Sequence, residues 1–380
     1  MTTDMSCRIL YLIGQLHAGG SERQLYYLLR NMDRDRYMPA VAVWNFCEKD
    51  AYVPAIRNLD VPIYSLVDRS SVAAKLGFLY SLVRRLKPEV LHSYSAYLNF
   101  AVHWSTRYTH TIGIGSTRSD FVLDWEGSSR WLACLNTRWP RNQIYNSFQA
   151  AKAASAAKRM FMPGHIYVVR NGVDLERFRP SPIPDSGVTN IVGIGSLIPI
   201  KRWDKLLAVA SELKQRSVEF SIQIAGDGSL RESLQHQIAN RVLEDRVQLL
   251  GHVTDVHHFL SGATFLVHCS DAEGCPNAVI EAMASGRAVV ATDVGDIPRL
   301  VDDGRTGFVV RRGDDEMLVR RIAELIANRD LSRRMGQAGR TKAEKNFGLD
   351  RLVAGTLAAY CAAGWKDSKP VDNRLSGVSN

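Results

Sequence analysis

The sequence lacks several features that would place it in a membrane, secreted or metal-binding class. It has no apolar run near the roughly 18 residues that suggest a membrane span. Its six cysteines form no CxxC pair, so neither a disulfide framework nor a zinc site is indicated. The first residues, MTTDMSCRIL, enter a strand-like run too early to hold the charged and apolar regions of a signal peptide. We therefore expect a cytoplasmic protein.

Two catalytic signatures are missing as well. His252, His257 and His258 lie close together but have no HExxH pattern and no carboxylate at metal-ligand spacing, so we predict no metal site. Gly193 and Gly195 begin a dinucleotide fingerprint whose third glycine would fall on Ile198. The incomplete fingerprint argues against a dehydrogenase.

The composition is that of a globular enzyme, with 46% hydrophobic and 23% charged residues. A chain of 380 residues is too long for one ordinary core, so two domains are expected.

Positive charge is distributed unevenly along the chain. Residues 1–170 hold 21 Lys and Arg against 12 Asp and Glu, whereas residues 171–380 hold 27 of each, so the first part carries the whole net charge of +9. Residues 127–173 contain seven Lys and Arg and no acid. Such a stretch suits an anionic partner, namely a phospholipid surface, a phosphorylated acceptor or nucleic acid. A solvated basic face without a partner is the alternative.

Six aromatic residues crowd the same region. Interleaved with Arg, they suit single-stranded nucleic acid or a membrane interface. For most of them, burial in the core is the expected role. They are Trp104, Tyr108, Phe121, Trp125, Trp131 and Trp139.

Strand-like runs alternate with helical patterns in two series. The first begins with CRILYLIG (7–14) and a helix from Ser21, where Ser21 and Gln24 have the spacing of a capping box. The second begins with TNIVGIGSL (189–197) after a proline-rich stretch. Helical connections between strands favour parallel sheets.

The fold class predicted from this alternation is α/β, with two Rossmann-like, doubly wound parallel-sheet domains whose ligand edges lie across a cleft. We expect an N-terminal domain over residues 1–170, a linker over 171–187 and a second domain over 188–349. A helix and a polar tail occupy 350–380, and the helix is expected to pack back on the first domain.

The most informative motif is DAEGCPNAVIEAMASG, residues 271–286. Pro276 suits a helix start and Gly286 suits its end. The N–H groups of the helix start would attract phosphate, and Glu273 and Glu281 would accept hydrogen bonds from sugar or ribose hydroxyls. Together these preferences describe a nucleotide-sugar. The alternative is that Glu273 only complements the helix dipole and Glu281 is a surface residue.

Three further positions lie at predicted ligand edges. Lys201 and Arg202 follow a strand and precede a helix, where a cation would neutralise a diphosphate leaving group; two solvated charges are the alternative. The Gly19-Gly20 pair allows close approach of a ligand or simply a tight turn. His92 ends a strand, and a structural role is expected ahead of a catalytic one.

Taken together, the motifs make the sequence similar to the retaining glycosyltransferases of family 4, which have the GT-B fold. EGCPNAVIEAMASG resembles the family's E-x7-E motif, and GGSER (19–23) resembles its first-loop signature. VVRNGVDLERFRP (168–180) resembles the strand and turn between the family's two domains. IKRWDKLL, IAGDGSLRESL, LLGHV and TGFVV follow in the family's order, so the resemblance covers nearly the whole chain.

The resemblance implies roles for individual residues. Glu273 would contact the donor sugar's hydroxyls near the reacting carbon, and Lys201 would act as the cation at the diphosphate. Glu281 would hold the ribose hydroxyls. The first-domain loop with Gly19 and Gly20 would close over the diphosphate. The backbone amides of the helix start would cradle that diphosphate. This stretch comprises Gly274, Cys275, Pro276 (which itself has no N–H), Asn277, Ala278 and Val279. The base would lie near the turn Gly251–Val253, which contains His252.

The sequence departs from the family pattern at four positions. Ser196 stands where Arg is common, so Arg202 is the candidate for the second diphosphate cation. Arg118 stands where a His often contacts the sugar, and Tyr94 replaces the second His of a frequent HxH whose first position is His92. Arg299 stands where Glu is common. We keep Ser196, Arg118 and His92 among the candidate substrate-binding residues.

The predicted function is a metal-independent, retaining glycosyltransferase that moves a hexose or N-acetylhexosamine to a glycan or lipid-linked acceptor, as in bacterial polysaccharide or glycoconjugate synthesis. No cofactor is expected; the donor is expected to be a UDP-sugar, with a GDP-sugar as the alternative. The expected partners are this donor, a saccharide or lipid-linked acceptor and, through the basic N-terminal domain, the anionic face of the cytoplasmic membrane; nucleic acid is not expected. The alternative functions are a nucleotide-sugar epimerase or hydrolase of the same fold, and a non-catalytic binder of anionic surfaces.

Overall fold

The computed structural model describes residues 7–67, 71–118, 130–156, 162–185 and 187–367. The chain divides into two compact units. Unit 1 runs to Gly172 and resumes at Leu349, and unit 2 comprises Val173–Gly348. Phe121, Trp125 and the polar tail after residue 367 lie outside the described residues.

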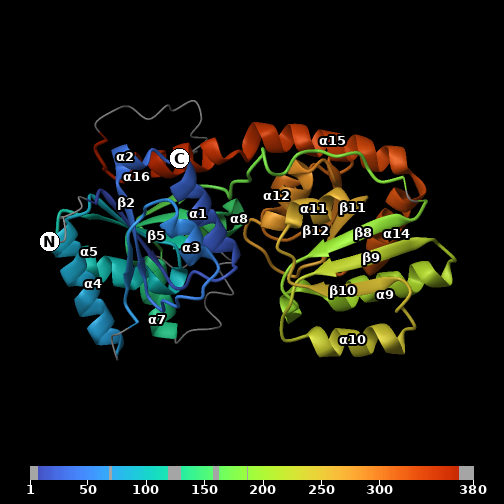
Figure 1. Ribbon diagram of the computed structural model, residues 1–380, viewed down its shortest axis with the longest axis horizontal. Coiled ribbons are helices and arrows are strands. Elements are labelled where there is room, and N and C mark those ends of the chain that lie inside the picture. The colour runs from blue at the N-terminus through green and yellow to red at the C-terminus, as the bar shows by residue number, and fades with distance from the viewer. Residues whose placement is uncertain (1–6, 68–70, 119–129, 157–161, 186, 368–380) are drawn as a thin grey trace. The chain divides into compact units, whose positions relative to one another are not determined.

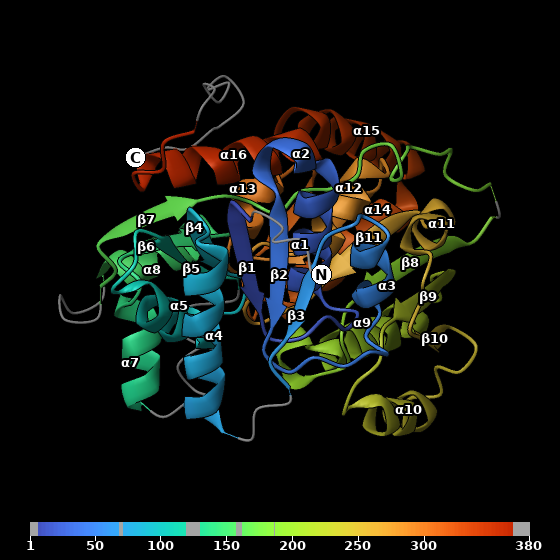
Figure 2. The same cartoon turned by 60° about the vertical axis from the view of Figure 1, so that its left-hand side comes forward.

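Unit 1 is built on a parallel sheet with helices on both faces (Figures 1 and 2). The strands follow one another in the order β3-β2-β1-β4-β5-β6-β7, so the order reverses between β1 and β4. The strands are β1 (Ile9–Ile13), β2 (Pro39–Val43), β3 (Ile63–Ser65), β4 (Val90–Ser93), β5 (Ile112–Thr117), β6 (Asn142–Tyr145) and β7 (His165–Val168). The helices are α1 (Gly20–Asn31), α2 (Arg34–Tyr37), α3 (Tyr52–Arg57), α4 (Val72–Leu86), α5 (Asn99–Thr106), α7 (Arg130–Arg138), α8 (Phe148–Ala156) and, from the end of the chain, α16 (Leu349–Ala362), with a short 3-10 turn η1 (Ala96–Leu98).

Unit 2 repeats the plan with strand order β10-β9-β8-β11-β12-β13, which reverses between β8 and β11. The strands are β8 (Thr189–Ile194), β9 (Phe220–Ala225), β10 (Val247–Gly251), β11 (Phe265–His268), β12 (Ala288–Thr292) and β13 (Gly307–Val310). The helices are α9 (Trp203–Gln215), α10 (Arg231–Asn240), α11 (Val256–Ser261), α12 (Asn277–Ala284), α13 (Ile297–Leu300), α14 (Asp315–Ala327) and α15 (Arg329–Asn346), with a 3-10 turn η3 (Pro199–Lys201) before α9. The predicted fold class is confirmed, because both sheets are parallel and doubly wound.

Alternation along the strands explains the two core layers of each unit. In β1, Ile9, Tyr11 and Ile13 face α1, α3 and α16, whereas Leu10 and Leu12 join the core formed with α4 and α5. Every residue of β1 is buried, as expected for a central parallel strand covered on both faces. The same sandwich is found in unit 2, where α9, α10 and α14 cover one face and α11, α12 and α13 cover the other.

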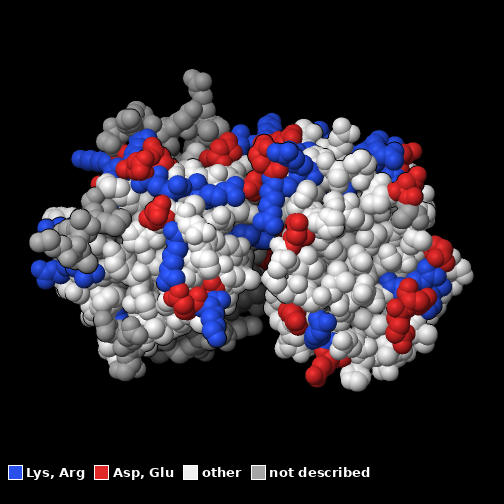
Figure 3. Space-filling model, viewed as in Figure 1, with Lys and Arg blue, Asp and Glu red and all other residues white. Residues whose placement is uncertain are grey.

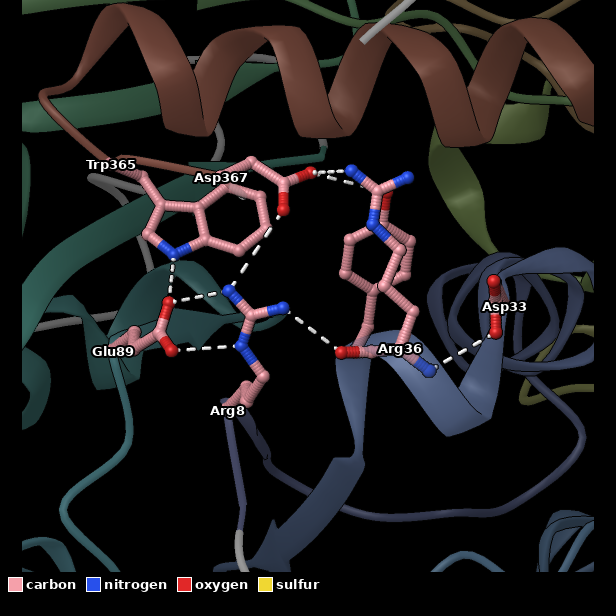
Figure 4. A network of polar contacts seen from close by, with 7 residues as sticks. Arg8, Asp33, Arg36, Glu89, Trp365 and Asp367 are labelled. Atoms are coloured by element: carbon pink, nitrogen blue, oxygen red, sulfur yellow. Dashed lines mark hydrogen bonds and ion pairs between the residues drawn. The ribbon is translucent and has the colours of Figure 1, made fainter. Parts of the chain in front are cut away.

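The end of the chain is fastened to unit 1 by a polar network (Figure 4). Arg8 donates to both carboxylate oxygens of Glu89 at 2.7 and 2.9 Å, and Trp365 Nε1 donates to the same carboxylate at 2.5 Å. Arg36 Nη2 lies 2.6 Å from Asp367 Oδ2. Because the Asp367 side chain is 2% exposed, these contacts hold the segment after α16 against the start of β1.

The proline-rich stretch predicted as a linker is largely packed on unit 2. Phe178 is buried in the core that contains α12, and the backbone N–H of Val173 donates to the Phe347 carbonyl. Arg287, itself 1% exposed, donates to Ser181 Oγ and to the carbonyls of Leu260, Ser261, Ser181 and Pro182. A hydrogen-bonded arginine therefore fixes the segment, although its proline content resembles that of a free linker.

The predicted capping box of α1 is wrong. Gly19, not Ser21, caps α1, and no side-chain hydrogen bond caps that helix. Gln24 instead pairs with the backbone of Gly172, donating to its carbonyl and accepting from its N–H, both at 2.8 Å.

Among the six aromatic residues of the basic region, most of which were expected in the core, Trp104 and Tyr108 are 41% and 74% exposed.

The surface of unit 2 carries both signs of charge. In Figure 3, acidic and basic side chains lie side by side on the surface of unit 2, in keeping with its nearly equal numbers of both. Among the described helices, none has the length and apolar character needed to cross a membrane.

Candidate functional site

A cluster of four polar side chains lies where the strand order of unit 2 reverses. Lys201 ends η3, which follows β8, and His268 is the last residue of β11. Ser270 and Glu273 stand on the loop that leaves β11. Since β8 and β11 are paired neighbours, both loops emerge at the same carboxyl edge, where doubly wound sheets bind ligands.

Glu273 is the centre of this cluster. Its Oε1 accepts from Lys201 Nζ at 2.5 Å and from Ser270 Oγ at 2.6 Å, and lies 2.9 Å from His268 Nε2. No hydrogen bond joins its Oε2 to any of the residues that the structure describes. One carboxylate oxygen is thus fixed by the protein while the other remains an acceptor for a ligand hydroxyl.

The surroundings keep Glu273 ionised. Burial is the strongest single influence on its pKa and acts to raise it, but His268 and Lys201 outweigh burial and hold the pKa well below its ordinary value of 4.5. His268 and Ser270 are 2% and 1% exposed, so the partners of the carboxylate are themselves shielded from water. The result is a permanently charged acceptor in a partly dry position.

Residues at and after the end of β12 hold the loop that carries Glu273 in place. Thr292 Oγ1 donates to the Ser270 carbonyl at 2.6 Å, and the Asp296 N–H donates to the Gly274 carbonyl at 3.1 Å. Gly295 has φ +53°, and a Cβ there would lie 2.0 Å from the Glu273 carbonyl oxygen. Glycine is therefore required at position 295 by both conformation and contact.

Helix α12 presents its start next to Glu273. Pro276 is the N-cap rather than the first helical residue, and no side chain caps the helix. The first turn of any helix leaves N–H groups that attract anions. Among the predicted cradle residues, Gly274, Pro276, Ala278 and Val279 are buried and Asn277 is half-buried, whereas the Cys275 side chain packs into the core.

Glu281 lies one turn inside α12 and is 3% exposed. The alternative that it is a surface residue is therefore wrong. Gly286 follows the helix with φ +70°, as expected for the residue that ends it. The stretch 271–286 thus forms a loop and a helix with one carboxylate on each.

Arg202 and Ser196 fit their predicted diphosphate roles less well. Arg202 Nη1 lies 2.7 Å from Asp271 and its Nη2 lies 2.9 Å from Asp204, and these two carboxylates raise the pKa of its guanidinium. Its charge is thus already compensated. Ser196 is exposed, and its carbonyl accepts from Trp203 Nε1. Gly193 serves the same packing, because a Cβ there would lie 2.5 Å from the Trp203 ring.

The predicted base-binding turn follows β10. Gly251 has φ +76°, and His252 beside it is exposed. The backbone N–H of Gly226 donates to the Gly251 carbonyl at 2.8 Å, which ties this turn to the loop after β9.

In unit 1, the glycine pair begins α1. Gly19 is the N-cap, and its N–H donates to the His17 carbonyl. The Glu22 side chain folds back over Gly19, where a Cβ would lie 2.1 Å from its Oε2. Burial raises the pKa of Glu22, so a carboxyl that resists ionisation covers this loop.

His92 and Arg118 differ in their surroundings. His92 is fully buried, with Nδ1 2.6 Å from Tyr360 Oη and Nε2 2.8 Å from Ser116 Oγ. Burial holds its pKa well below the ordinary value. This favours the structural interpretation of His92 over sugar binding. Arg118 directly follows β5, and its guanidinium carbon lies 3.7 Å from the centre of the Tyr94 ring.

No group of three or more His, Cys, Asp or Glu side chains suited to a metal ion occurs in the described part of the chain.

Residues 176–342, nearly all of unit 2, match the family model of glycosyl transferases group 1. The lipopolysaccharide core biosynthesis mannosyltransferase LpcC of Rhizobium leguminosarum is 27% identical over 275 residues, which cover 68% of this chain and 77% of that protein. The D-inositol 3-phosphate glycosyltransferase of Streptomyces scabiei is 32% identical over 53% of this chain, and the match spans about half of that relative, 49%. Over residues 176–342 the chain thus matches the group 1 glycosyl transferases, and its fold is GT-B.

Solved structures agree on the fold of this glycosyltransferase. Anabaena HepE in complex with UDP-glucose superposes with a TM-score of 0.80 over 93% of this chain and 99% of that one, at 18% identity. The sucrose-phosphate synthase of Thermosynechococcus elongatus gives a TM-score of 0.78 over 93% and 98% of the two chains, at 17% identity.

Sequence reasoning missed two members of the cluster in this glycosyltransferase. His268 and Ser270 both contact Glu273, yet neither was singled out. The available signal was the position of His268 at the end of a buried strand, followed within five residues by the motif's first glutamate. Two polar residues buried beside a carboxylate are seen only once the loop is folded.

Proposed function

We propose that the protein is a retaining, metal-independent glycosyltransferase that moves a hexose or N-acetylhexosamine from a nucleotide-sugar to a glycan or lipid-linked acceptor. The observation that carries the proposal is the Lys201–Glu273 pair beside the uncapped start of α12, which also carries the buried Glu281. The cation and the helix start suit the phosphates of such a donor, and the two carboxylates suit its hydroxyl groups.

Each part of the site has one task in this proposal. Lys201 and the first turn of α12 hold the diphosphate and stabilise the charge that develops on it as the glycosidic bond breaks. Glu273, through Oε2, accepts hydroxyl groups of the donor sugar, and Glu281 accepts those of the ribose. Lys201 donates one of its three N–H groups to Glu273, so the other two can donate to phosphate oxygens.

The transfer step is a substitution at the anomeric carbon. An acceptor hydroxyl oxygen forms the new bond, the bond from that carbon to the phosphate oxygen breaks, and the nucleoside diphosphate leaves. The acceptor's proton passes to the departing phosphate oxygen on the same face, so configuration is retained. The protein contributes positioning and charge stabilisation.

Relatives' names support a sugar nucleotide and a membrane-linked acceptor without fixing either. LpcC is named a mannosyltransferase of lipopolysaccharide core biosynthesis, and a Mycobacterium tuberculosis relative, 30% identical over 48% of this chain, is named as dependent on GDP-mannose and acting on a phosphatidylinositol monomannoside. HepE was solved with UDP-glucose. We therefore extend the proposal to UDP- and GDP-sugars as donors.

The decisive experiment is donor binding by calorimetry, with UDP-, GDP- and ADP-sugars in the presence of EDTA. We expect one donor to bind to the wild type and to lose about tenfold or more in affinity in Glu281→Gln, because a buried hydroxyl acceptor is lost. Glu244→Gln, at an exposed position of unit 2, is the matched control and should bind as the wild type does.

Turnover separates the alternatives. The proposal requires a product with the donor's anomeric configuration when an acceptor is supplied, read by NMR. Donor conversion at full rate without any acceptor would favour an epimerase or hydrolase. Absence of binding by every sugar nucleotide would overturn both.

We also propose that unit 1 contacts anionic membrane through α4 and α5, which pack on each other. Arg107 stacks on the exposed rings of Trp104 and Tyr108, at 5.7 and 4.6 Å from their centres. Arg84 and Arg85 are exposed on α4. Amphipathic rings beside cations suit a lipid headgroup layer.

Vesicle sedimentation tests this contact. Binding should require anionic lipid, weaken with salt, and fall several-fold in the Trp104→Ala, Tyr108→Ala double variant. Equal binding to neutral vesicles, or no effect of the double variant, would contradict the assignment.

A further inference from the structure

Arg118 occupies a position where a parallel sheet offers its ligands a surface. It directly follows β5, and Tyr94, on which it stacks, directly follows β4. These strands are paired neighbours, so both residues lie at the carboxyl edge of the sheet of unit 1. The ring of Tyr94 is 1% exposed and provides a rigid support for the guanidinium.

The guanidinium of Arg118 lacks the partners that a buried cation normally has. Its Nε and Nη1 are both shielded from solvent, and neither makes a hydrogen bond within the described part of the chain. No carboxylate of the described residues lies within 4.0 Å of it. A desolvated charge without a counter-ion is costly, so such a group is retained where a ligand supplies the missing charge.

The described side chains around Arg118 do not supply that charge. Its positive charge acts on the side chains of Tyr11, His92, Tyr94 and Tyr360, all fully buried. Burial raises the pKa of each phenol and lowers that of the imidazole, so all four are neutral at physiological pH. The cation therefore lies against a neutral, aromatic wall.

Arg287, which is fully buried, shows what a structural guanidinium looks like in this chain. Arg287 donates to five oxygens, namely four backbone carbonyls and the Ser181 hydroxyl, at 2.6 to 3.4 Å. Every nitrogen of Arg287 is thus paired without any ligand. Arg118 has cation–π contact with Tyr94 in place of such bonds, which separates its role from that of a packing residue.

We propose that Arg118 binds an anionic group, a carboxylate or a phosphate, carried by one of the sugar substrates. The proposal rests on the glycosyl transfer proposed above and adds the chemical class of one substrate. A planar guanidinium with two shielded donors matches the oxygens of such a group in both geometry and charge. A neutral hydroxyl would meet the hydrogen bonds but leave the charge uncompensated. The anion belongs either to the donor sugar or to the acceptor.

The test is calorimetry on the full-length chain in two arms. The donor arm compares UDP-glucuronate with UDP-glucose. The acceptor arm titrates glucuronate and glucose 6-phosphate, against glucose, into the protein with and without UDP. UDP alone is titrated in parallel, because its binding reports the proposed donor site and does not depend on Arg118.

In one arm the wild type should favour the anionic sugar by about tenfold or more. Arg118→Gln should bring that ratio close to one, and Arg118→Lys, which keeps the charge without the planar fork, should restore part of it. The arm that responds identifies the source of the anion. Arg118→Lys also decides the matter should Arg118→Gln fail to fold.

The inference is overturned when UDP binds but the wild type shows no preference for an anionic sugar in either arm. It is equally overturned when Arg118→Gln keeps the preference. An anion preference that depends on Arg118 in a protein that fails to bind UDP would support the anion site and contradict the proposed donor site.

Discussion

Arg287 in unit 2 is fully buried and Arg118 in unit 1 is half-buried, and their guanidinium groups differ in the number of hydrogen-bond partners they have. Arg287 meets five oxygens, whereas Nε and Nη1 of Arg118 meet none among the described residues. The same contrast holds for the two ligand edges. In unit 2 the Glu273 carboxylate faces Lys201, while in unit 1 the Arg118 guanidinium lies over the neutral ring of Tyr94 and has no carboxylate partner within the described residues.

The difference shows that burial of a charge has two distinct meanings in this protein. A charge with all its bonds made holds the fold together, as Arg287 does for the segment around Ser181. A charge with unmet hydrogen bonds is instead a candidate for binding a ligand, as proposed for Arg118. Glu273 stands between the two cases, because Oε1 is fully engaged and Oε2 is not.

The largest expected effect is the loss of stability on replacing Arg287, the arginine with a structural role. Arg287→Met should destabilise the protein by about 3–5 kcal/mol, because buried carbonyls around it would lose their donors. Urea unfolding measures the change. Arg334→Met, at an exposed position, is the control and should stay within about 0.5 kcal/mol of the wild type. A loss at Arg287 no larger than this would refute the structural role.

An intermediate effect is expected at Glu273. Glu273→Gln should cost about 2 kcal/mol at pH 7, because Lys201 and His268 lose a charged acceptor. Since the folded-state pKa of Glu273 lies below the ordinary 4.5, its contribution is fully present above pH 4.5 and is lost as the pH falls toward the folded-state pKa.

Unfolding of the wild type and Glu273→Gln at pH 7, 5 and 3.5 measures this dependence. The difference in the free energy of unfolding should be constant between pH 7 and 5 and smaller at pH 3.5. A difference that grows as the pH falls would contradict the sign, and Glu244→Gln provides the exposed control.

The smallest expected effect on stability is that of replacing Arg118, and it separates the two arginines most clearly. Arg118→Met should leave the stability of the ligand-free protein unchanged or raise it by about 1 kcal/mol. It removes a cation whose Nε and Nη1 are shielded from solvent and which has no carboxylate partner among the described residues. Side by side with Arg287→Met, the same substitution should thus have opposite consequences in the two units. A loss of about 2 kcal/mol or more at Arg118 would assign it a structural role.

Much of the fold was readable from the pattern of residues. Buried strands such as β1 are continuous apolar runs, and Gly286 has the positive φ that its place after α12 predicts. The order of strand and helix then leads to doubly wound sheets with few alternatives. The pattern did not single out β6, because NQIY places two polar residues in a strand of only four.

The candidate site was readable only in part. Glu273, Glu281 and Lys201 were predicted from their spacing and from strand ends, and the structure brings Lys201 and Glu273 together; their roles in binding stay predictions. The partners that set their properties were not found, since His268 and Ser270 reach Glu273 through a loop whose course depends on Gly295 and Asp296, more than 20 residues later in the chain. The family roles of Arg202, Ser196 and His252 remain predictions.

By itself, then, the sequence determined the two parallel sheets and the ends of the site helix, because periodicity and turn preferences are local properties. It also named the candidate residues for the chemistry, whose roles stay predictions. Only the tertiary structure decided which charges are compensated. Arg202 and Arg118 are the same residue type in the sequence. In the structure Arg202 lies between Asp204 and Asp271, whereas Arg118 lies over the ring of Tyr94. Pairing depends on which loops meet in space, and no local preference of the chain encodes that.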